Sequence, residues 1–341
     1  MKVKSIICIF LLLAFTGYNT GVLAAGSTDD ATIIGGGARP LGMGKAFVAI
    51  ADDADAIFIN PSGIAGIKSP QAMSMFTNLL NEVYYMEFSG AVPAPMGALG
   101  VGYIATGTNG ILIGSPEVST NYYDTLLAFS YSSPLARFTQ YGRNIFLGTD
   151  IKLYSRGYSG GINQQATGIS ADIGLKFIYN PYLSFGICRQ NIMPVALGGK
   201  IQWHPSGAEE NLAGIDKVGI AIKPINFDKK VTLAYDVDLP AYGTRPVTMH
   251  FGGEWQMHEA LCLRGGLDQN LDSSTQTKVS WNPTFGLSLE IKNFRLDYAY
   301  HGYYNDPSLA TNYISISLRG EQGDILRGRQ ALLIDQENSV L

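Results

Sequence analysis

Apolar and polar residues alternate along most of the chain, from about residue 71 to residue 319. The clearest stretch is Asn144–Arg156. One parity there holds Ile145, Leu147, Thr149, Ile151 and Leu153, and the other holds Asp150, Lys152, Tyr154 and Arg156. Because side chains on a β-strand point to opposite faces with a period of two, such strands have one apolar and one charged face. A soluble sandwich buries the apolar face, whereas a membrane barrel turns it to lipid and turns the charged face to its lumen.

The alternation predicts fourteen strands, most of them about as long as a tilted strand that crosses a bilayer. Their expected ranges are Gln71–Thr77, Val83–Val92, Ala98–Gly107, Tyr122–Ser132, Asn144–Arg156, Thr167–Ile178, Tyr182–Arg189, Gly214–Lys223, Lys230–Asp238, Pro246–Met257, Ala260–Asp268, Pro283–Ile291, Phe294–His301 and Tyr313–Arg319. We therefore expect an all-β protein, a transmembrane antiparallel β-barrel of about fourteen strands with an N-terminal plug.

The connections between these strands support a barrel. Tight links are expected at Pro95-Met96, Asn180-Pro181, His258-Glu259 and Lys292-Asn293. Longer polar segments alternate with them, at Thr108–Asn121, Gly157–Ala166, Asn191–Ala213, Gln269–Asn282 and Gly302–Asn312. Short turns at one end and long loops at the other are typical of outer-membrane barrels. Two connections depart from this pattern, since Asn78–Glu82 is short where a long loop is expected and Ser133–Arg143 is long where a turn is expected.

Composition agrees with a membrane barrel. Only 15% of the 341 residues are charged, against a usual share of about 25%. Glycine (40) and tyrosine (19) are abundant, as strands with interfacial aromatic residues require. The formal net charge of −4 argues against a nucleic-acid partner.

The N-terminus has the pattern of a secretory signal peptide over residues 1–24. Lys2 and Lys4 precede the apolar stretch Ser5–Phe15, and small residues follow near Ala24. Cleavage would change the net charge from −4 to −6 and would identify a secreted or envelope protein. An uncleaved anchor helix is the alternative, but its apolar core would be short for that purpose.

Residues 25–70 are the expected plug of the barrel, which spans residues 71–319, and residues 320–341 form a tail. A fourteen-stranded lumen is too wide for side chains of the wall alone to fill, so it would leak without a plug. In this segment Asp52, Asp53 and Asp55 suit the start of a short helix, and Asn60-Pro61 would end it.

This segment also resembles a known family. Gly-Ala-Arg-Pro-Leu-Gly-Met-Gly (37–44), Ala-Phe-Val-Ala-Ile-Ala-Asp-Asp (46–53) and Asn-Pro-Ser-Gly (60–63) are similar to the N-terminal signature of the PorV/PorQ family, within the superfamily of the long-chain fatty-acid transporter FadL. The resemblance implies a barrel around an N-terminal hatch. The hatch residues that it implies are Arg39, Gly42, Gly44, Asp52, Asp53, Asn60, Pro61 and Gly63. Ser62 departs from the family pattern, in which alanine is commoner there, and the last strand lacks a terminal aromatic residue.

Charged residues at the polar parity predict an ion-pair lattice that faces the lumen and holds strands and plug together; a selectivity surface is the alternative. The lattice residues are Asp150, Lys152, Asp172, Lys176, Glu254, Arg264, Asp268, Arg295 and Asp297. In the longest outer loop, Met193, Ile201 and Trp203 are candidates for contact with a ligand or partner. The alternative for these three is that the loop folds over the barrel's own rim.

Motifs of other chemistries do not fit their required context. Gly157-Tyr158-Ser159-Gly160-Gly161 has the spelling of a nucleophile elbow, but that motif needs a strand that turns sharply into a helix. Asp53-Ala54-Asp55 resembles the start of an EF-hand loop, which Ile57 and Phe58 then break. We expect no enzyme activity, no catalytic residues, no cofactor and no metal.

The leading functional hypothesis is a passive conduit for small hydrophobic molecules in the bacterial outer membrane. The expected surroundings are outer-membrane lipid and lipopolysaccharide. The alternative, implied by the resemblance, is a PorV-like component of a type IX secretion system that binds cargo or secretion proteins through its outer loops. A soluble periplasmic β protein is a third possibility.

Overall fold

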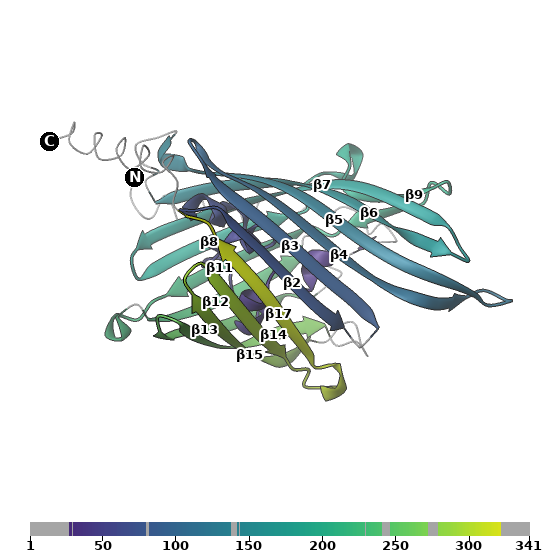
Figure 1. Cartoon of the computed structure of the whole chain (residues 1–341). Coiled ribbons are helices and arrows are strands. Elements are labelled where there is room, and N and C mark those ends of the chain that lie inside the picture. Colours follow the sequence, from purple (N-terminus) through teal and green to yellow (C-terminus); the bar gives the residue numbers. More distant parts are fainter. Residues whose placement is uncertain are drawn as a thin grey trace.

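Fourteen strands close into one antiparallel barrel, which confirms the predicted fold class (Figure 1). A computed structural model describes residues 27–28, 30–79, 82–137, 142, 144–228, 230–240, 246–271 and 279–321. The signal peptide and most of the predicted tail lie outside these residues. The ring closes where β17 pairs with β2 and where β8 pairs with β11. The remaining strands β1, β9 and β10 lie outside the ring, at one rim.

Each of the fourteen predicted strands is present. The first half of the ring contains β2 (Gln71–Leu79), β3 (Val83–Ala94), β4 (Gly97–Ile113), β5 (Val118–Pro134), β6 (Ile145–Gly160), β7 (Gln164–Asn180) and β8 (Leu183–Gln190). The second half contains β11 (Ile215–Ile222), β12 (Val231–Pro240), β13 (Thr248–His258), β14 (Leu261–Leu271), β15 (Val279–Ile291), β16 (Phe294–His301) and β17 (Thr311–Arg319). The rim strands are β1 (Ser27–Thr28), β9 (Lys200–His204) and β10 (Glu209–Leu212).

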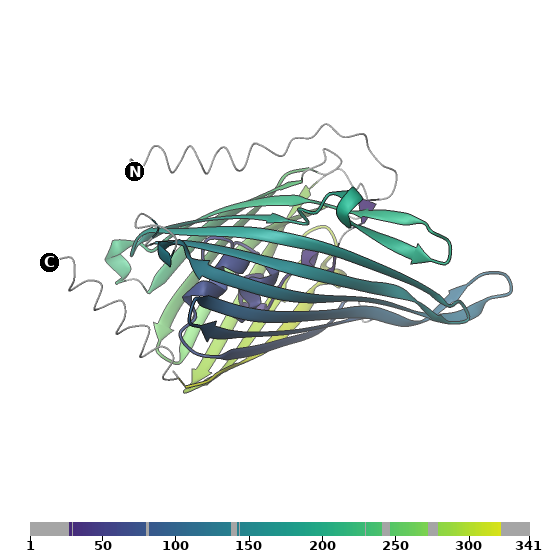
Figure 2. The same cartoon turned by 90° about the horizontal axis from the view of Figure 1, so that it is seen from above.

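The wall is much taller on one side than on the other. Strands β4 to β7 have 16 or 17 residues, whereas β8, β11 and β16 have 8. The β4–β5 hairpin, blue in Figure 2, projects beyond the rest of the barrel. The predicted loop Thr108–Asn121 is therefore wrong in its inner part, because both strands continue to a short tip at Gly114–Glu117. The β-branched residues Ile111, Ile113 and Val118 favour this continued pairing.

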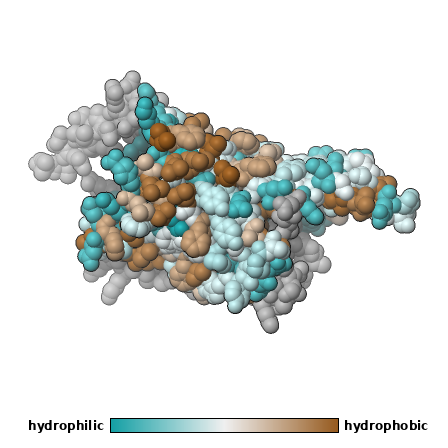
Figure 3. All heavy atoms as spheres, turned by 60° about the horizontal axis from the view of Figure 1, so that its bottom comes forward, coloured by the Kyte–Doolittle hydropathy of each residue, from teal (hydrophilic) through white to brown (hydrophobic). Residues whose placement is uncertain are grey.

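The outer face of the barrel is apolar. Phe88, Phe129 and Ile151 are each 52% exposed, and they lie on three different strands. Figure 3 shows hydrophobic side chains gathered over one such face. Rows of exposed aromatic and aliphatic residues around a closed barrel suit contact with lipid acyl chains. Among the described residues, no helix is long and apolar enough to cross a membrane.

Residues 30–70, which we call the hatch, fill the lumen. The chain enters at the rim that carries the long loops (the loop end), where Ser27 pairs with Asn211 of β10. It leaves at the opposite rim (the short-turn end), where Gln71 begins β2. The hatch contains η1 (Ala31–Ile33), α2 (Ala38–Gly42), η2 (Ala54–Phe58) and η3 (Pro61–Gly66). The remaining short helices are η4 (Leu135–Arg137), η5 (Val195–Leu197), η6 (Ile225–Phe227) and η7 (Pro307–Leu309).

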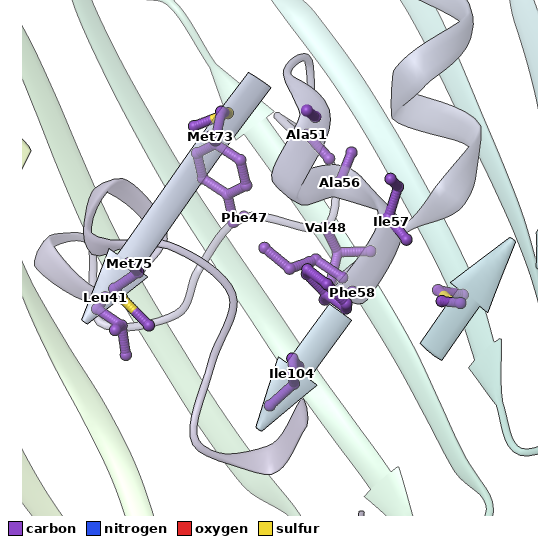
Figure 4. Close-up of a cluster of buried hydrophobic side chains, with 14 of the residues drawn as sticks. Leu41, Phe47, Val48, Ala51, Ala56, Ile57, Phe58, Met73, Met75 and Ile104 are labelled. Carbon is purple, nitrogen blue, oxygen red and sulfur yellow. The ribbon is translucent and has the colours of Figure 1, made fainter. Parts of the chain in front are cut away.

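An apolar core inside the hatch joins it to the wall. Leu41, Phe47, Ile57 and Phe58 are buried together, and Ile104 of β4 packs against this group (Figure 4). The lumen is thus filled by a segment with its own hydrophobic core, surrounded by a wall of polar side chains.

The expected short helix of the hatch is present as the 3-10 helix η2, and a second one, η3, follows it. Asp53 precedes η2, but its side chain does not cap that helix. Asn60 follows η2 and instead caps η3, because its Oδ1 accepts a hydrogen bond from the Ser62 N–H. Asn60-Pro61 therefore ends one helix, as predicted, and begins another.

Candidate functional site: a hatch clamped in the barrel

Arg39 of the hatch joins two hatch carboxylates to the wall. Its Nη1 lies 2.6 Å from Asp52 Oδ1 and 3.1 Å from Asp53 Oδ2, and its Nε lies 2.9 Å from Glu254 Oε2 on β13. The Arg39 side chain is 10% exposed, whereas that of Asp52 is 52% exposed. Charge-assisted hydrogen bonds of this length are about twice as strong as neutral ones.

Two wall arginines extend this network. Arg264 Nε lies 2.7 Å from Glu254 Oε2 and its Nη1 lies 3.3 Å from Asp297 Oδ1. Arg295 pairs with Asp297 at 2.7 Å and with Asp53 of the hatch at 3.2 Å. We call these groups the arginine cluster; its members are Arg39, Asp52, Asp53, Glu254, Arg264, Arg295 and Asp297. Asp53 Oδ2 binds both Arg39 and Arg295, so the side chain is oriented toward the arginines rather than toward η2.

A second ion-pair network surrounds Lys152 of β6. Its Nζ lies 2.9 Å from Asp172 Oδ1 on β7 and 2.9 Å from Asp30 Oδ2 at the start of the hatch. The Tyr154 hydroxyl also donates to Asp30 Oδ2. Asp150 lies beside this network, where its Oδ1 accepts the Asp172 N–H. Asp30, Lys152, Tyr154 and Asp172 are all buried, and the wall fixes the loop-end start of the hatch through Lys152 and Tyr154.

A third network centres on Asp268 of β14. His250 Nδ1 and His301 Nε2 each lie 2.7 Å from its carboxylate, and Lys45 of the hatch lies 3.4 Å away. Lys45 has a φ of 65°, a conformation that is uncommon for a residue with a side chain. Asp268 was expected to belong to the lattice; its partners Lys45, His250 and His301 were not.

Wall side chains also bind the hatch backbone directly. Asp236, Lys176, Gln190 and Glu87 each form hydrogen bonds with hatch N–H or C=O groups. Lys176 was expected in an ion-pair lattice, but its Nζ donates to the Ile50 and Ala51 carbonyl oxygens instead. Every lattice residue that the sequence predicts faces the lumen, and Lys176 differs from the others in binding the hatch backbone. Asp150 accepts a wall backbone N–H instead of the expected ion pair.

The predicted hatch glycines lie where the hatch backbone touches other backbone. A Cβ on Gly42 would lie 2.9 Å from the Gly286 Cα, and one on Gly63 would lie 2.4 Å from the Ala51 oxygen. Gly44 has a φ of 60°, and a Cβ there would lie 2.7 Å from the Phe251 oxygen. These three positions leave no room for a side chain.

Asn60 and Pro61 fix the short-turn part of the hatch. The Asn60 Nδ2 donates to the Val48 oxygen at 3.0 Å and to the Leu175 oxygen of β7 at 3.4 Å. Pro61 lies on Gly148 of β6, where a Cβ would come within 2.3 Å of the Pro61 carbonyl carbon. Asn60 therefore links two parts of the hatch to each other and to the wall.

The longest outer loop folds back on the rim. Ile201 is fully buried, and Trp203 stacks on Tyr158 of β6 and donates from Nε1 to Glu210. Met193 is half-buried. The exposed apolar side chains of this loop are instead Ile192, Val195 and Leu197. Of the three residues expected to contact a ligand or partner, Ile201 offers no free surface, because β9 pairs with the loop end of β7.

Cavities lie on both sides of the hatch. The outer cavity, of about 110 Å³, opens toward the loop end and is lined partly by Ile33, Lys45, Val48, Phe58 and Ile59. The inner cavity, of about 250 Å³, opens toward the short-turn end and is lined partly by Ala49, Ile50, Phe146, Lys176 and Leu183. A third space of about 430 Å³, also at the short-turn end, is lined by all members of the arginine cluster except Asp297, together with Lys68, Glu290 and Arg319.

Two buried carboxyl groups meet between the hatch and β3. Glu87 Oε2 accepts the Gly37 N–H at 2.9 Å, and Asp55 Oδ1 accepts the Ser89 hydroxyl at 2.5 Å. Burial away from water favours the protonated, uncharged form of a carboxyl group. Burial, with a smaller contribution from Asp53, raises the pKa of Asp55 to about 7.

We predict that the proton on the Asp55 carboxyl group makes the stability of the hatch depend on pH. The folded chain keeps the Asp55 proton up to about pH 7, whereas the unfolded chain loses it near pH 4. The Asp55 contribution to the free energy of unfolding therefore falls as pH rises between these values. In Asp55→Asn, urea unfolding should lose this part of the pH dependence, because an amide does not titrate in this range. An identical pH dependence in both proteins would contradict the raised pKa of Asp55.

The residues that match the nucleophile-elbow motif lie at the end of a strand. Gly157–Gly160 ends β6, and Gly161 leads into the short turn before β7. No helix follows, so the local structure that this motif needs is missing from these described residues.

Comparison with known proteins identifies the fold. No protein-family model matches the sequence, and no curated protein matches it. The Pseudomonas putida toluene transporter TodX has a similar structure, with a TM-score of 0.56, 12% identity and coverage of 86% of this chain and 97% of that one. A Pseudomonas aeruginosa FadL homologue gives a TM-score of 0.57 and 11% identity over 89% of this chain and 100% of that one. The chain therefore has the plugged-barrel fold of FadL-type proteins, and the likeness extends over nearly the whole of it.

Proposed function

We propose that the protein is a passive conduit for small hydrophobic molecules in the bacterial outer membrane. The observation that carries the proposal is a pair of partly apolar cavities, one on each side of the hatch, inside a barrel with an apolar outer face. The fold likeness to a toluene transporter supports it. The N-terminal pattern of a signal peptide supports export across the inner membrane.

The outer cavity is the proposed entry site. Apolar side chains of Ile33, Val48, Phe58 and Ile59 face it, and Lys45 provides a polar edge. Its volume of about 110 Å³ is somewhat below that of an apolar cavity of about 150 Å³ that holds benzene. The site therefore suits compact apolar molecules, with some widening as the ligand enters.

The hatch is the proposed barrier. It separates the two cavities, so transport requires it to shift within the lumen or to let the ligand leave sideways through the wall. Arg39, Asn60 and Pro61 would control that movement, because they link hatch segments to one another or to the wall.

Ile33→Trp should block entry. Ile33 is 43% exposed and lines the outer cavity, and the larger indole would fill much of that space. The test is uptake of N-phenyl-1-naphthylamine by cells with an intact lipopolysaccharide layer, which slows apolar molecules. We expect uptake to fall to the level of cells that lack the protein. Phe88→Trp, on the lipid face, is the matched control and should transport normally; equal uptake in both variants would contradict the entry site.

A second candidate is a scaffold that binds secretion proteins, as the resemblance to PorV implies. Exposed apolar side chains on the loop end favour it, with Leu197 at 71% and Leu112 at 61% exposed. Purification in mild detergent distinguishes the two functions. Copurified small apolar molecules support the conduit, whereas a stoichiometric protein that is lost when the 110–117 hairpin tip is shortened supports the scaffold.

A further inference from the structure

One turn of the hatch separates the outer cavity from the inner cavity. Val48 lines the outer cavity, and the next two residues, Ala49 and Ile50, line the inner one. Adjacent residues thus face opposite ends of the barrel. The stretch Phe47–Ala51, part of which is visible in Figure 4, therefore forms part of the partition between the two spaces.

Two wall positions beside this turn carry no side chain. Gly186 of β8 pairs with Gly219 of β11. A Cβ on Gly186 would lie 2.3 Å from the Val48 oxygen, and one on Gly219 would lie 3.0 Å from the Val48 Cβ. At these two positions the turn rests on backbone, and Asp236 Oδ1 lies beside it, 2.3 Å from where a Gly219 Cβ would be. Moving the turn away would leave space along this part of the wall, since neither glycine has a side chain to fill it.

Two buried charged side chains hold the turn from opposite sides. Asp236 Oδ2 of β12 accepts the N–H groups of Phe47 at 2.6 Å and Val48 at 2.7 Å. Lys176 Nζ of β7 donates to the carbonyl oxygens of Ile50 at 2.9 Å and Ala51 at 2.7 Å. One wall charge therefore binds the start of the turn and the other binds its end.

Other contacts of the turn come from neutral groups. Ser184 Oγ donates to the Ala49 oxygen at 3.1 Å, and Asn60 Nδ2 donates to the Val48 oxygen at 3.0 Å. The second carboxylate oxygen of Asp236 is buried and has no hydrogen-bond partner among the described residues. Among the described residues, the two amide N–H groups are thus the hydrogen-bond donors to this carboxylate, and losing them would leave it buried without compensation.

We propose that Phe47–Ala51 is the gate of the conduit and that Asp236 and Lys176 are its latch. Displacement of the turn from Gly186 and Gly219 joins the outer cavity to the inner one. A compact, uncharged apolar molecule then passes along the wall formed by β8 and β11 toward the short-turn end. The inference rests on the proposed conduit function and adds its route and its barrier.

The test removes each half of the latch. Asp236→Ala and Lys176→Met should each raise uptake of N-phenyl-1-naphthylamine at least threefold over the unmodified protein. Asp150→Ala is the matched control, because Asp150 is also a buried wall carboxylate but its hydrogen bond goes to the wall at Asp172. It should leave uptake unchanged. Heat-modified migration on gels verifies that each variant is a folded barrel.

A second measurement does not depend on transport. Ala49→Cys is labelled from outside with a membrane-impermeant maleimide, with Cys188 and Cys262 replaced by serine. Labelling should be slow, and adding Asp236→Ala should accelerate it at least tenfold. Unchanged labelling and unchanged uptake in the latch variants would overturn the gate. If Ile33→Trp still blocks uptake in that case, the conduit function stands and only the gate is lost.

Discussion

Replacing Arg39 by alanine is expected to lower the free energy of unfolding by about 3 kcal/mol and to make the barrel conduct ions. The change removes one partner from Asp53 and Glu254, which are both largely buried. Breaking a buried ion pair from one side typically costs about 3–5 kcal/mol. The lower value applies because Arg295 and Arg264 still contact these carboxylates.

Ion conductance should accompany the loss of stability. Arg39 links the hatch to β13. Without a seated hatch, the lumen of a fourteen-stranded barrel is wider than that of a small barrel filled by side chains and narrower than that of an open porin channel. Planar-bilayer recordings measure the conductance, and urea unfolding in detergent measures the stability. Arg39→Lys should recover only part of the lost stability and should suppress only part of the conductance, since one ammonium group cannot reproduce the guanidinium fork that binds three carboxylates.

Arg319→Ala is the matched control for this experiment. Arg319 pairs with Glu290 at 2.7 Å, but its side chain is 38% exposed. An exposed pair contributes at most about 1 kcal/mol. If Arg39→Ala and Arg319→Ala had equal effects and neither conducted ions, the arginine cluster would not hold the hatch in place.

Ile151→Arg is expected to destabilise the barrel in lipid by about 2–4 kcal/mol, the cost of an arginine near the bilayer midplane. Ile151 is 52% exposed and lies on the apolar parity of β6. It is six residues from the short-turn end of that strand, roughly 15 Å along the barrel axis for a tilted strand. The measurement is the urea midpoint for unfolding from lipid vesicles, with the folding yield as a second readout.

Leu112→Arg is the control for the lipid-facing charge. Leu112 is 61% exposed, near the tip of the projecting β4–β5 hairpin. It lies fifteen residues from the short-turn end of β4, beyond the expected thickness of the bilayer. The charge should therefore cost little there. Equal destabilisation by both arginines would mean that membrane depth does not decide the effect.

The alternation of apolar and polar residues was enough to predict the barrel and the side of the wall on which each charged residue lies. Lys152, Asp172 and Asp297 are buried at lumen-facing positions because a strand cannot turn single residues to its other face. The alternation does not show where a strand ends. The continuation of β4 and β5 past Thr108 depends on strand pairing outside the membrane, which alternating apolar residues do not report.

The partners of the lumen residues could not be predicted. Lys176 has the same sequence signal as Lys152, yet one binds hatch carbonyl oxygens and the other binds carboxylates. The difference depends on which hatch segment lies opposite each strand, and that is a property of the folded chain. Glu87 and Asp236 stand at polar parity as well, so the alternation placed them in the lumen without indicating that they bind hatch N–H groups.

The hatch was recognised from small residues and a family signature, and its glycines have a physical explanation. Gly42, Gly44 and Gly63 lie at contacts where backbone meets backbone. The wall glycines that face Gly42 and Gly44, which are Gly286 and Gly266, gave no separate signal in the sequence. Close approach requires glycine on both surfaces, but only the clustered ones are apparent along the chain.

The most direct test of the account is tryptophan quenching by lipids brominated on their acyl chains. The chain has three tryptophans, so variants that keep one each can be compared. Trp255 and Trp281 are 48% and 39% exposed on strands β13 and β15, whereas Trp203 lies in the folded outer loop. We predict strong quenching of Trp255 and Trp281 and little quenching of Trp203. A protein that stays monodisperse in buffer without detergent, with none of its tryptophans quenched by the brominated lipid, would contradict the account.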